Sequence, residues 1–576
     1  MRRLVVPLLL LLCAGCVGLP ESGAVQEVAG RSTPVLDEGF PYAPRPPQPG
    51  ESRDEIVSHF LDAMTANPIT TSVARQFLAE EARGSWNPEA RMITYTDAST
   101  PTGSSTVEVE LRGANHLDAA GSWQGRLPEA EATIEFPMTR EDGEWRIARA
   151  PDAMIVPSSW FDQRYRRASL YFFDPTGRIL VPEQVFVPRG GQLATALMRG
   201  LIRGPGNSLR GVSRSFFPNG LSLDLSAPVS ATGVAEVALQ GDVSTAGSEA
   251  LDLMIVQIAW TLRQDPSVQR VRVTVGDSPI TGSGTGSDFA VGIGQIYDPS
   301  GVYAWEDMFG LRESRLVSSI DGRESRVRGP FGRRDHGLRD VSIDLPADQV
   351  AGVTQAGDRV LLARVDDEDR HGSVRTVHSG AKDLLHPAWD HAGRLWLLDR
   401  RPQGAMVTVW ADGVSRRVRV PGVTGEEVVD FLVSRDGSRL VAALDRPRSD
   451  VVVVSRLVHE GRRIRATPAR AVLRGAGDPL DLSDLGWRSP TEAAALNRPI
   501  ANLSEVGTFS VDGSPVVGSG DTTTELVRDD IVRLVGAPSE ELPFWVVPDE
   551  GTVFQLPPER EAGVPLFGIE ALTYVG

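Results

Sequence analysis

Cysteine is almost absent from this sequence. Only Cys13 and Cys16 occur among its 576 residues, and both lie near the N-terminus. The rest of the chain can therefore form no internal disulfide, no thiolate metal site and no catalytic thiol. After its N-terminal segment the sequence also lacks any apolar stretch of the roughly 20 residues that a membrane-spanning helix needs. Buried apolar side chains must hold the protein together, and 576 residues are enough for several such cores.

Sequence patterns of catalytic sites are missing too. No Gly-x-Ser-x-Gly elbow occurs, and no nucleophile lies beside an evident His and Asp pair. The glycine run from Thr281 to Ser287 lacks the Lys-Ser/Thr of a phosphate-binding loop and predicts a linker. We therefore expect no catalytic residue, no cofactor and no enzymatic activity.

Metal binding is not predicted either. Four of the eight histidines lie close together, and the separations between His371, His378, His386 and His391 are 7, 8 and 5 residues. These separations do not match zinc-binding patterns such as His-Glu-x-x-His. The segment from His386 to Trp389 instead predicts a loop that buries its tryptophan.

The charge balance excludes one class of partner. The formal net charge is −17, and loss of Arg2 and Arg3 with a signal peptide makes it −19. A protein this acidic repels the phosphates of nucleic acids, so we expect no nucleic-acid partner.

The N-terminal run gives the clearest positive signal. Arg2 and Arg3 precede a short apolar stretch that ends in Ala14-Gly15-Cys16. This pattern resembles a bacterial lipobox and predicts a signal peptide over residues 1–15, with Cys16 converted to N-palmitoyl, S-diacylglycerol cysteine. Cys13 departs from the leucine usual at its position, and an uncleaved anchor is the alternative. We expect a lipid-anchored protein on the extracytoplasmic face of the cell membrane.

A proline-rich tether follows over residues 16–50. It holds Pro34, Pro41, Pro44, Pro46, Pro47 and Pro49 and few aliphatic side chains. Such a composition cannot bury enough surface to fold. Fully extended at about 3.1 Å per residue, a tether of this length spans about 100 Å.

The first folded domain is predicted over residues 51–157. Ser52 and Glu55 have the spacing of a capping box at the start of a helix, and a second helix is predicted from Thr71 to Ala82. Period-two patterns then predict strands near residues 92–96, 105–111, 132–138 and 144–148. Two helices followed by a β-meander resemble an NTF2-like α+β cone. Its lone His116, predicted in a loop, offers no acid–base pair, which favours binding or packing over catalysis.

The second domain, residues 158–290, alternates strands and helices. Strands are predicted at 178–182, 235–239 and 271–276, and helices at 193–203 and 249–263. The segments Leu201–Pro205, Pro218–Gly220 and Gln257–Leu262 resemble those of the GerMN domain, an α+β module without an established catalytic residue set.

The third domain, residues 294–576, shows recurring glycine turns before short apolar strands. Gly357, Gly393 and Gly437 are 36 and 44 residues apart, which is typical of an all-β propeller whose blades take about 40–45 residues. The length predicts about six blades, with five or seven as alternatives. Asp390, Asp436 and Asp512 precede turn glycines and are expected to cap turn amides. The run Arg462–Arg465 predicts a protected strand edge, with contact to anionic lipid or envelope polymer as the alternative.

Taken in order, these features resemble the LpqB lipoprotein family of actinobacteria. The segments Cys16–Gly23, His386–Asp390 and Leu395–Arg400 carry the resemblance together with the GerMN series. The resemblance implies an accessory protein of the MtrA–MtrB two-component system that acts on the extracytoplasmic domain of the sensor histidine kinase, in envelope homeostasis and cell division.

We therefore expect a non-enzymatic modulator that binds a sensor kinase. A binder or carrier of a cell-wall polymer or small ligand is the alternative, and a propeller hydrolase is a third class. The hydrolase needs a constellation of polar residues at the channel mouth, and the sequence shows no such constellation.

Overall fold

The computed structural model describes residues 41–576, apart from 207–208, 210, 277, 282–285, 302–306, 321–322, 368–371, 476–477, 517–523, 551 and 558–567. The predicted signal peptide, Cys13, Cys16 and the tether up to residue 40 lie outside the described residues. Phe40–Gly576 forms one compact unit. Within the described residues no helix is both long and apolar enough to cross a bilayer.

The first helix of the N-terminal domain, α2 (Arg53–Ala63), begins where the sequence predicts. The Ser52 hydroxyl accepts the Glu55 N–H and the Glu55 carboxylate accepts the Ser52 N–H, which confirms the capping box. The apolar face of the helix is buried, and Phe60 packs its ring against Trp86 and Phe136.

The predicted helix from Thr71 to Ala82 is wrong. The chain forms a 3-10 turn, η1 (Ala74–Phe77), and a short helix, α3 (Glu80–Ser85). Between them Leu78 is extended and bridges Ile147, and the Ala79 N–H donates to the Ile147 carbonyl at 2.9 Å. Pairing with a strand thus outweighs helix propensity at this point.

Two sheets complete this domain. One has the order β6-β5-β1-β9 and the other β2-β4-β7-β8, with β3 paired to β4. His116 lies on β5 and not in a loop, which corrects its prediction. The bounds are β1 (Arg91–Tyr95), β2 (Asp97–Ala98), β3 (Thr102–Gly103), β4 (Thr106–Arg112), β5 (Asn115–Asp118), β6 (Trp123–Arg126), η2 (Glu129–Glu131), β7 (Thr133–Glu141), β8 (Glu144–Ile147), β9 (Met154–Pro157) and α4 (Ser158–Arg164).

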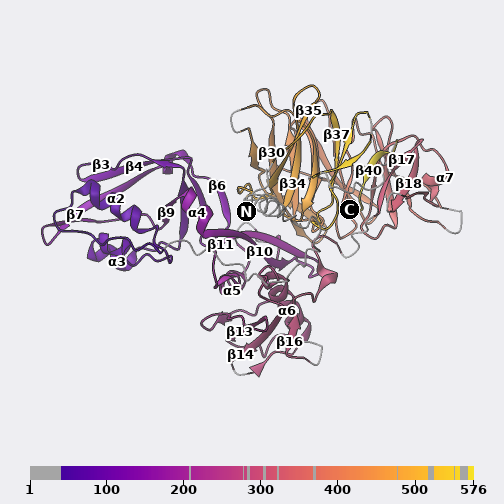
Figure 1. Cartoon of the computed structure of the whole chain (residues 1–576). Coiled ribbons are helices and arrows are strands. Elements are labelled where there is room, and N and C mark those ends of the chain that lie inside the picture. Colours follow the sequence, from indigo (N-terminus) through magenta and orange to yellow (C-terminus); the bar gives the residue numbers. More distant parts are fainter. Residues whose placement is uncertain are drawn as a thin grey trace, which may run out of the picture. The chain divides into compact units, whose positions relative to one another are not determined.

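The second domain opens with a long hairpin, β10 (Tyr165–Phe173) and β11 (Leu180–Pro188). Both predicted helices and two of the three predicted strands are found: α5 (Leu193–Arg203), β13 (Val234–Gln240), α6 (Ser248–Leu262) and β14 (Arg270–Val275). The strand predicted at 178–182 instead begins at Leu180 and continues to Pro188 as β11. β13 and β14 run parallel, as expected when a helix connects two strands. In Figure 1, α6 lies between the β10–β11 hairpin and the sheet of β13, β14 and β16. The remaining elements are β12 (Ser222–Leu223), β15 (Ser278–Pro279), β16 (Asp288–Ala290) and η4 (Gln295–Tyr297).

Six sheets follow one another in the third domain within the described residues, which agrees with a six-bladed propeller. Blade 1 contains β17 (Met308–Arg312), β18 (Arg315–Ile320), β19 (Arg323–Arg326) and β40 (Glu570–Thr573), with α7 (Pro330–Arg333) after β19. Blade 2 contains β20 (Leu338–Ile343), β21 (Gln349–Thr354), β22 (Arg359–Arg364) and β23 (Arg375–Ser379). Blade 3 contains β24 (Ala388–Trp389), β25 (Leu395–Asp399), β26 (Met406–Ala411) and β27 (Val414–Val418).

The other three blades repeat the same antiparallel order. Blade 4 contains β28 (Val428–Val433), β29 (Arg439–Leu444), β30 (Val451–Glu460), β31 (Arg463–Ala466) and β32 (Arg470–Arg474). Blade 5 contains β33 (Leu482–Ser489), β34 (Glu492–Ile500), β35 (Leu503–Ser510) and β36 (Thr524–Val527). Blade 6 contains β37 (Ile531–Val535), β38 (Trp545–Pro548) and β39 (Phe554–Gln555). The ring closes when β40, from the end of the chain, pairs with β17 and completes the sheet of blade 1 in the order β19-β18-β17-β40.

The separations between the three turn glycines do not all equal the length of one blade. Gly393 and Gly437 precede the second strands of blades 3 and 4, but Gly357 precedes the third strand of blade 2. All three glycines have φ between 67° and 69°, so the same left-handed turn occurs at two different places in a blade.

The aspartates of the turns have the predicted role. Asp390, Asp436 and Asp512 each accept the N–H of the residue two positions later, at 2.8–3.0 Å. Trp389 is fully buried, as predicted, but Ala388 and Trp389 form strand β24 and not the expected loop.

The two faces of the propeller differ in what they contact. We call the face where the innermost strands begin the open face and the face where they end the docked face. On the docked face, Arg456 pairs with Glu183 at 3.0 Å, and the Ser510 hydroxyl donates to the Gln184 side chain at 2.7 Å. Strand β11 therefore packs against blades 4 and 5, while its Phe186 N–H donates to Gly121 of the first domain at 2.8 Å.

Arg439 is the most deeply buried charge at this junction. Its side chain is 1% exposed, pairs with Asp436 at 3.2 Å and donates to the Pro182 carbonyl. Burial lowers the pKa of Arg439 to about 10, so the guanidinium stays charged at neutral pH. Such a group stabilises a fold only while its partners remain in place.

We expect Arg439→Leu to destabilise the protein by about 3 kcal/mol, because it removes the donor from a buried carboxylate and a buried carbonyl. Urea unfolding followed by tryptophan fluorescence measures the change. Arg448→Leu is the matched control, since Arg448 is exposed. Equal effects of both substitutions would contradict a structural role for the buried pair.

Candidate functional site

One position recurs near the start of the innermost strands. Asp340 on β20, Asp430 on β28, Asp484 on β33 and Arg533 on β37 are each the third residue of their strand. His386 lies two residues before β24. These five residues, the axial cluster, come from five successive blades and lie around the propeller axis toward the open face.

A β-bulge helps to place these side chains. The pairing of β20 with β21 shifts register between Leu338 and Asp340, and the same shift occurs at the corresponding residues of β28, β33 and β37. A bulge adds one residue to a strand and re-aims the side chain that follows it. The repeated shift therefore gives each of these four blades a polar group at the same place in its innermost strand.

The carboxylates join neighbouring blades. Asp430 accepts the N–H of Leu485 in blade 5 at 2.9 Å, and Asp484 accepts the N–H of Leu534 in blade 6 at 2.5 Å. Each bond crosses from the innermost strand of one blade to that of the next. The cluster thus ties the centre of the ring together.

Asp340 forms the charged half of the cluster. Its carboxylate lies 2.9 Å from Nδ1 of His386 and 2.8 Å from Nη2 of Arg533. Burial alone would raise the pKa of Asp340, but the charges of Arg533 and His386 outweigh it and hold this pKa well below the usual range. The same contacts raise the pKa of Arg533 despite its burial.

Asp430 and Asp484 form the other half and behave in the opposite way. Burial raises the pKa of Asp484, and the neighbouring Asp430 raises it further. The pKa of Asp430 is raised as well, chiefly by burial. Two adjacent carboxyl groups that cannot both ionise share a proton.

The cluster uses its hydrogen-bonding capacity within the ring. Asp340 is held by Arg533 and His386, while Asp430 and Asp484 are held by backbone N–H groups and by a side-chain hydrogen bond to each other. In the part of the chain that the structure describes, no group of three His, Cys, Asp or Glu side chains is placed to hold a metal. The arrangement supports ring closure.

A cavity of about 260 Å³ opens beside the cluster on the same face. It lies between blades 3 and 4 and is lined by Arg400, Arg401, Ala405, Glu426, Glu427, Val428, Val429 and Asp445. Val428 and Val429 begin β28, directly before Asp430. The cavity therefore adjoins the axial cluster along the chain.

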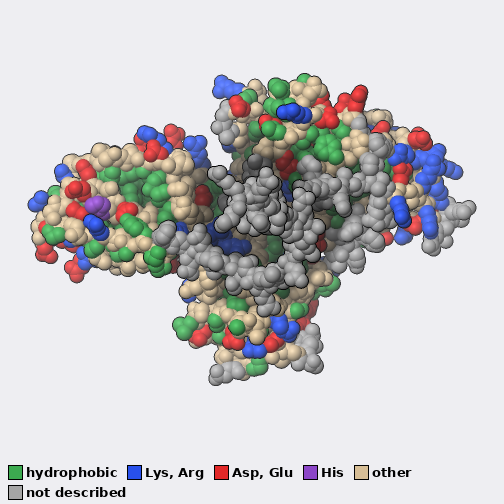
Figure 2. Space-filling model, in the orientation of Figure 1, with side chains coloured by type: hydrophobic (Ala, Val, Ile, Leu, Met, Phe, Trp, Pro, Cys, Tyr) green, Lys and Arg blue, Asp and Glu red, His purple; other side chains and the backbone are tan. Residues whose placement is uncertain are grey.

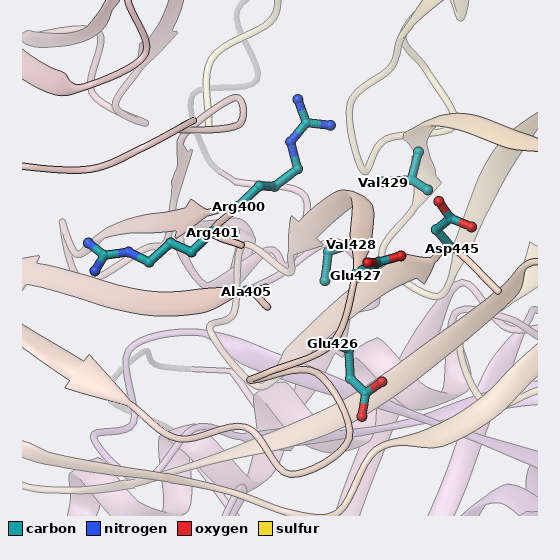
Figure 3. Close-up of a pocket in the computed structure, with 8 residues that line it drawn as sticks. All are labelled: Arg400, Arg401, Ala405, Glu426, Glu427, Val428, Val429 and Asp445. Carbon is teal, nitrogen blue, oxygen red and sulfur yellow. The ribbon is translucent and has the colours of Figure 1, made fainter. Parts of the chain in front are cut away.

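Among the described residues, both arginines around this cavity form ion pairs, but only one of its three acidic side chains does. Arg400 pairs with Asp383, Arg401 with Asp399, and Glu426 with Arg446. Figure 3 shows the carboxylates of Glu427 and Asp445 extending toward the same space, while the two guanidinium groups point apart. Glu427 and Asp445 are exposed and pair with no cation in the described part of the chain. The cavity is suited to a cationic group.

The structure brings few of the singled-out residues together. Cys16 and His371 lie outside the described residues. His386 contacts Asp340, whereas His391 lies 3.8 Å from Asp174 on the docked face. His378 lies on β23, at the outer edge of blade 2.

The axial cluster is the constellation that sequence reasoning missed. Asp340, His386, Asp430, Asp484 and Arg533 follow one another at intervals of 46, 44, 54 and 49 residues. These intervals are close to one blade each, and an apolar residue lies two positions before every member. A search for polar residues at this spacing would have found the cluster; the turn glycines concealed it, because they occur at two different places in the blade.

Family models match three parts of the chain. The model of the lipoprotein LpqB N-terminal domain matches residues 46–162, and a sporulation and spore germination domain matches residues 169–281. The model of the lipoprotein LpqB beta-propeller domain matches residues 314–559.

Full-length relatives give the same result. Lipoprotein LpqB of Thermobifida fusca is 25% identical over 95% of this chain and 94% of that relative. Lipoprotein LpqB of Mycolicibacterium paratuberculosis is 30% identical over 78% of this chain and 72% of that relative.

Solved structures align only weakly. TolB from Acinetobacter baumannii is 11% identical and covers 62% of this chain and 99% of its own, with a TM-score of 0.33. A chain of the nidogen/laminin complex is 10% identical and covers 47% of this chain and 98% of its own, with a TM-score of 0.34. A likeness at this level adds nothing to the family models.

The shared proton predicts an unusual pH dependence of stability. Because the folded-state pKa of Asp484 is raised, its stabilising proton is present at low pH and is lost as the pH rises through that pKa. Asn cannot ionise. We therefore expect Asp484→Asn to raise the midpoint of thermal unfolding at about pH 8 and to lose this advantage at about pH 4.

Asp340→Asn is the matched control and is expected to act in the opposite direction. Its lowered pKa contributes stability above the unfolded-state pKa, and this stability disappears as the pH falls. The control should lower the midpoint at about pH 8, with a difference that shrinks toward acid. A lowered midpoint for both variants at the higher pH would rule out the shared proton.

Proposed function

The chain belongs to the LpqB lipoprotein family, and from this membership we propose that it is a lipid-anchored, non-enzymatic accessory protein that binds and modulates a sensor histidine kinase. The observation that carries the proposal is the match to lipoproteins along almost the whole chain, together with the lipobox that ends in Cys16. Their names state a lipoprotein and no catalytic activity. The proposed partner is the extracytoplasmic domain of an MtrB-like kinase.

Lipidation of Cys16 gives this proposal its location. A lipid anchor on the extracytoplasmic face confines the folded body to a layer one tether length deep. Confinement of this kind raises the effective concentration of the body near a membrane receptor. Binding of modest affinity is then sufficient for regulation.

The open face is the surface that we assign to the partner. The docked face already contacts β11 through Arg439, Arg456 and Ser510. The open face presents the cavity and two exposed apolar side chains, Ile500 at 66% and Val532 at 39% exposure. Exposed apolar groups beside polar ones are typical of protein interfaces.

The cavity adds a chemical preference to this surface. Glu427 and Asp445 leave negative charge at its rim, since Arg400 is already paired with Asp383. A lysine or arginine side chain of the partner fits this charge and gives the interface orientation.

Binding of the purified kinase domain tests the assignment. Ile500→Glu with Val532→Glu should weaken binding by at least about tenfold, because charges would replace apolar contacts at the interface. Isothermal titration calorimetry measures the change. Leu225→Glu with Val414→Glu is the control, since these apolar residues are also exposed, at 79% and 48%, and lie elsewhere.

Absence of binding by the unsubstituted protein, with both partners folded, would count against the kinase proposal. Retention on purified cell-wall glycan in the same preparation would favour the alternative function as a glycan binder.

The anchor is tested separately by mass spectrometry of the membrane-extracted protein. We expect a chain that begins at Cys16 and carries a diacylglyceryl group and an N-acyl group, and Cys16→Ala should abolish both. Cys13→Leu is the control and should be processed normally, because it restores the residue usual at that position. Loss of lipid in both variants would contradict the assignment of Cys16 alone.

A further inference from the structure

The outer edge of blade 1 carries a dense group of arginines. Seven occur between residues 312 and 334: Arg312, Arg315, Arg323, Arg326, Arg328, Arg333 and Arg334. They lie on or beside β17, β18, the edge strand β19 and α7. Figure 2 shows basic side chains gathered over the end of the propeller that carries these elements.

Among the residues that the structure describes, most of these arginines have no acidic partner. Arg312 pairs with Glu324 at 2.5 Å and Arg333 with Asp367 at 2.9 Å. The other five form what we call the arginine face, and none of them pairs with a carboxylate in the described part of the chain. Its members are Arg315, Arg323, Arg326, Arg328 and Arg334, and all except the partly buried Arg315 are exposed.

The arginine face stands out against the rest of the protein. The chain as a whole has a net charge of −17, so an excess of positive charge at one edge is a local feature. Unpaired like charges repel one another, and an anionic partner removes this cost. Charged side chains also protect an edge strand from pairing, but Arg328 and Arg334 lie outside the edge strand β19, so this role does not account for them.

The guanidinium groups of the arginine face are compatible with a phosphate-bearing partner. Lys382 is the only lysine in the sequence, so nearly all of the 59 basic residues are arginine. The planar guanidinium donates two parallel hydrogen bonds to phosphate oxygens, which an ammonium group cannot do. A surface of exposed guanidinium groups therefore suits phosphate groups.

We propose that the arginine face binds the anionic phospholipid headgroups of the membrane that holds the anchor. The proposal rests on the lipid-anchored state proposed above, which keeps blade 1 within reach of such headgroups. Each arginine near an anionic bilayer adds to the attraction, which salt weakens. The anchor then retains the protein at the membrane, and the arginine face orients it there.

Vesicle binding tests this proposal without the anchor. Phe40–Gly576 is one compact unit, so this part is used as a soluble protein. We compare the fraction of this protein that sediments with phosphatidylcholine vesicles and the fraction that sediments with vesicles containing about 30% phosphatidylglycerol. We expect binding to the anionic vesicles only, with loss when the salt concentration rises from about 0.05 to about 0.5 M.

Substitutions identify the surface. Arg326→Ala, Arg328→Ala and Arg334→Ala together should reduce partitioning by at least about tenfold. The control combines Arg417→Ala, Arg419→Ala and Arg463→Ala, which remove three exposed arginines from the outer edges of blades 3 and 4. It should change partitioning by less than about twofold. Circular dichroism checks that both variants are folded.

Three outcomes would overturn the proposal. They are absence of binding to the anionic vesicles, an equal loss in the control variant, and stronger binding to lipid-free cell wall than to the vesicles. Kinase binding of the arginine variant is measured in parallel and should be unchanged. Loss of kinase binding with intact vesicle binding would assign the arginine face to the protein partner instead, and failure of the kinase proposal alone would leave vesicle binding intact.

Discussion

The propeller depends on closing a ring of sheets without a covalent cross-link. Two interactions close it. In blade 1 β40 pairs with β17 as the innermost strand, where Phe309 faces Thr573, and near the axis the carboxylates of Asp430 and Asp484 accept N–H groups from the neighbouring blades. With no cysteine after Cys16, stability comes from these bonds and from the cores between blades. The third residue of these innermost strands is polar because its side chain forms the bonds between blades.

Local patterns in the sequence predicted most of the fold. The capping box of Ser52 and Glu55, both long helices of the second domain and the aspartate turns are set by neighbours in the chain. The predictions failed where the local structure depends on contacts between residues that are far apart in the sequence. Leu78 leaves the expected helix because it pairs with Ile147, a contact that helical periodicity does not reveal.

The spacing of the axial cluster could be read from the sequence, but the contacts within the cluster could not, for the same reason. Asp340 and Arg533 meet only because ring closure brings blade 2 and blade 6, which flank blade 1, around one axis. The lowered pKa of Asp340 and the raised pKa of Asp484 follow from that geometry, since both residues are aspartates at equivalent places in their strands. Only the neighbour differs, a guanidinium in one case and a second carboxyl in the other.

The position of β40 also affects the order in which the protein can fold. The ribosome synthesises the chain from the N-terminus, so β17, β18 and β19 emerge long before the strand that completes their sheet. Until then blade 1 presents an unpaired edge, and the ring cannot close. Closure is therefore one of the last steps of maturation. A nascent chain cut short within blade 6 lacks it, which gives proteases a direct way to distinguish incomplete molecules from finished ones.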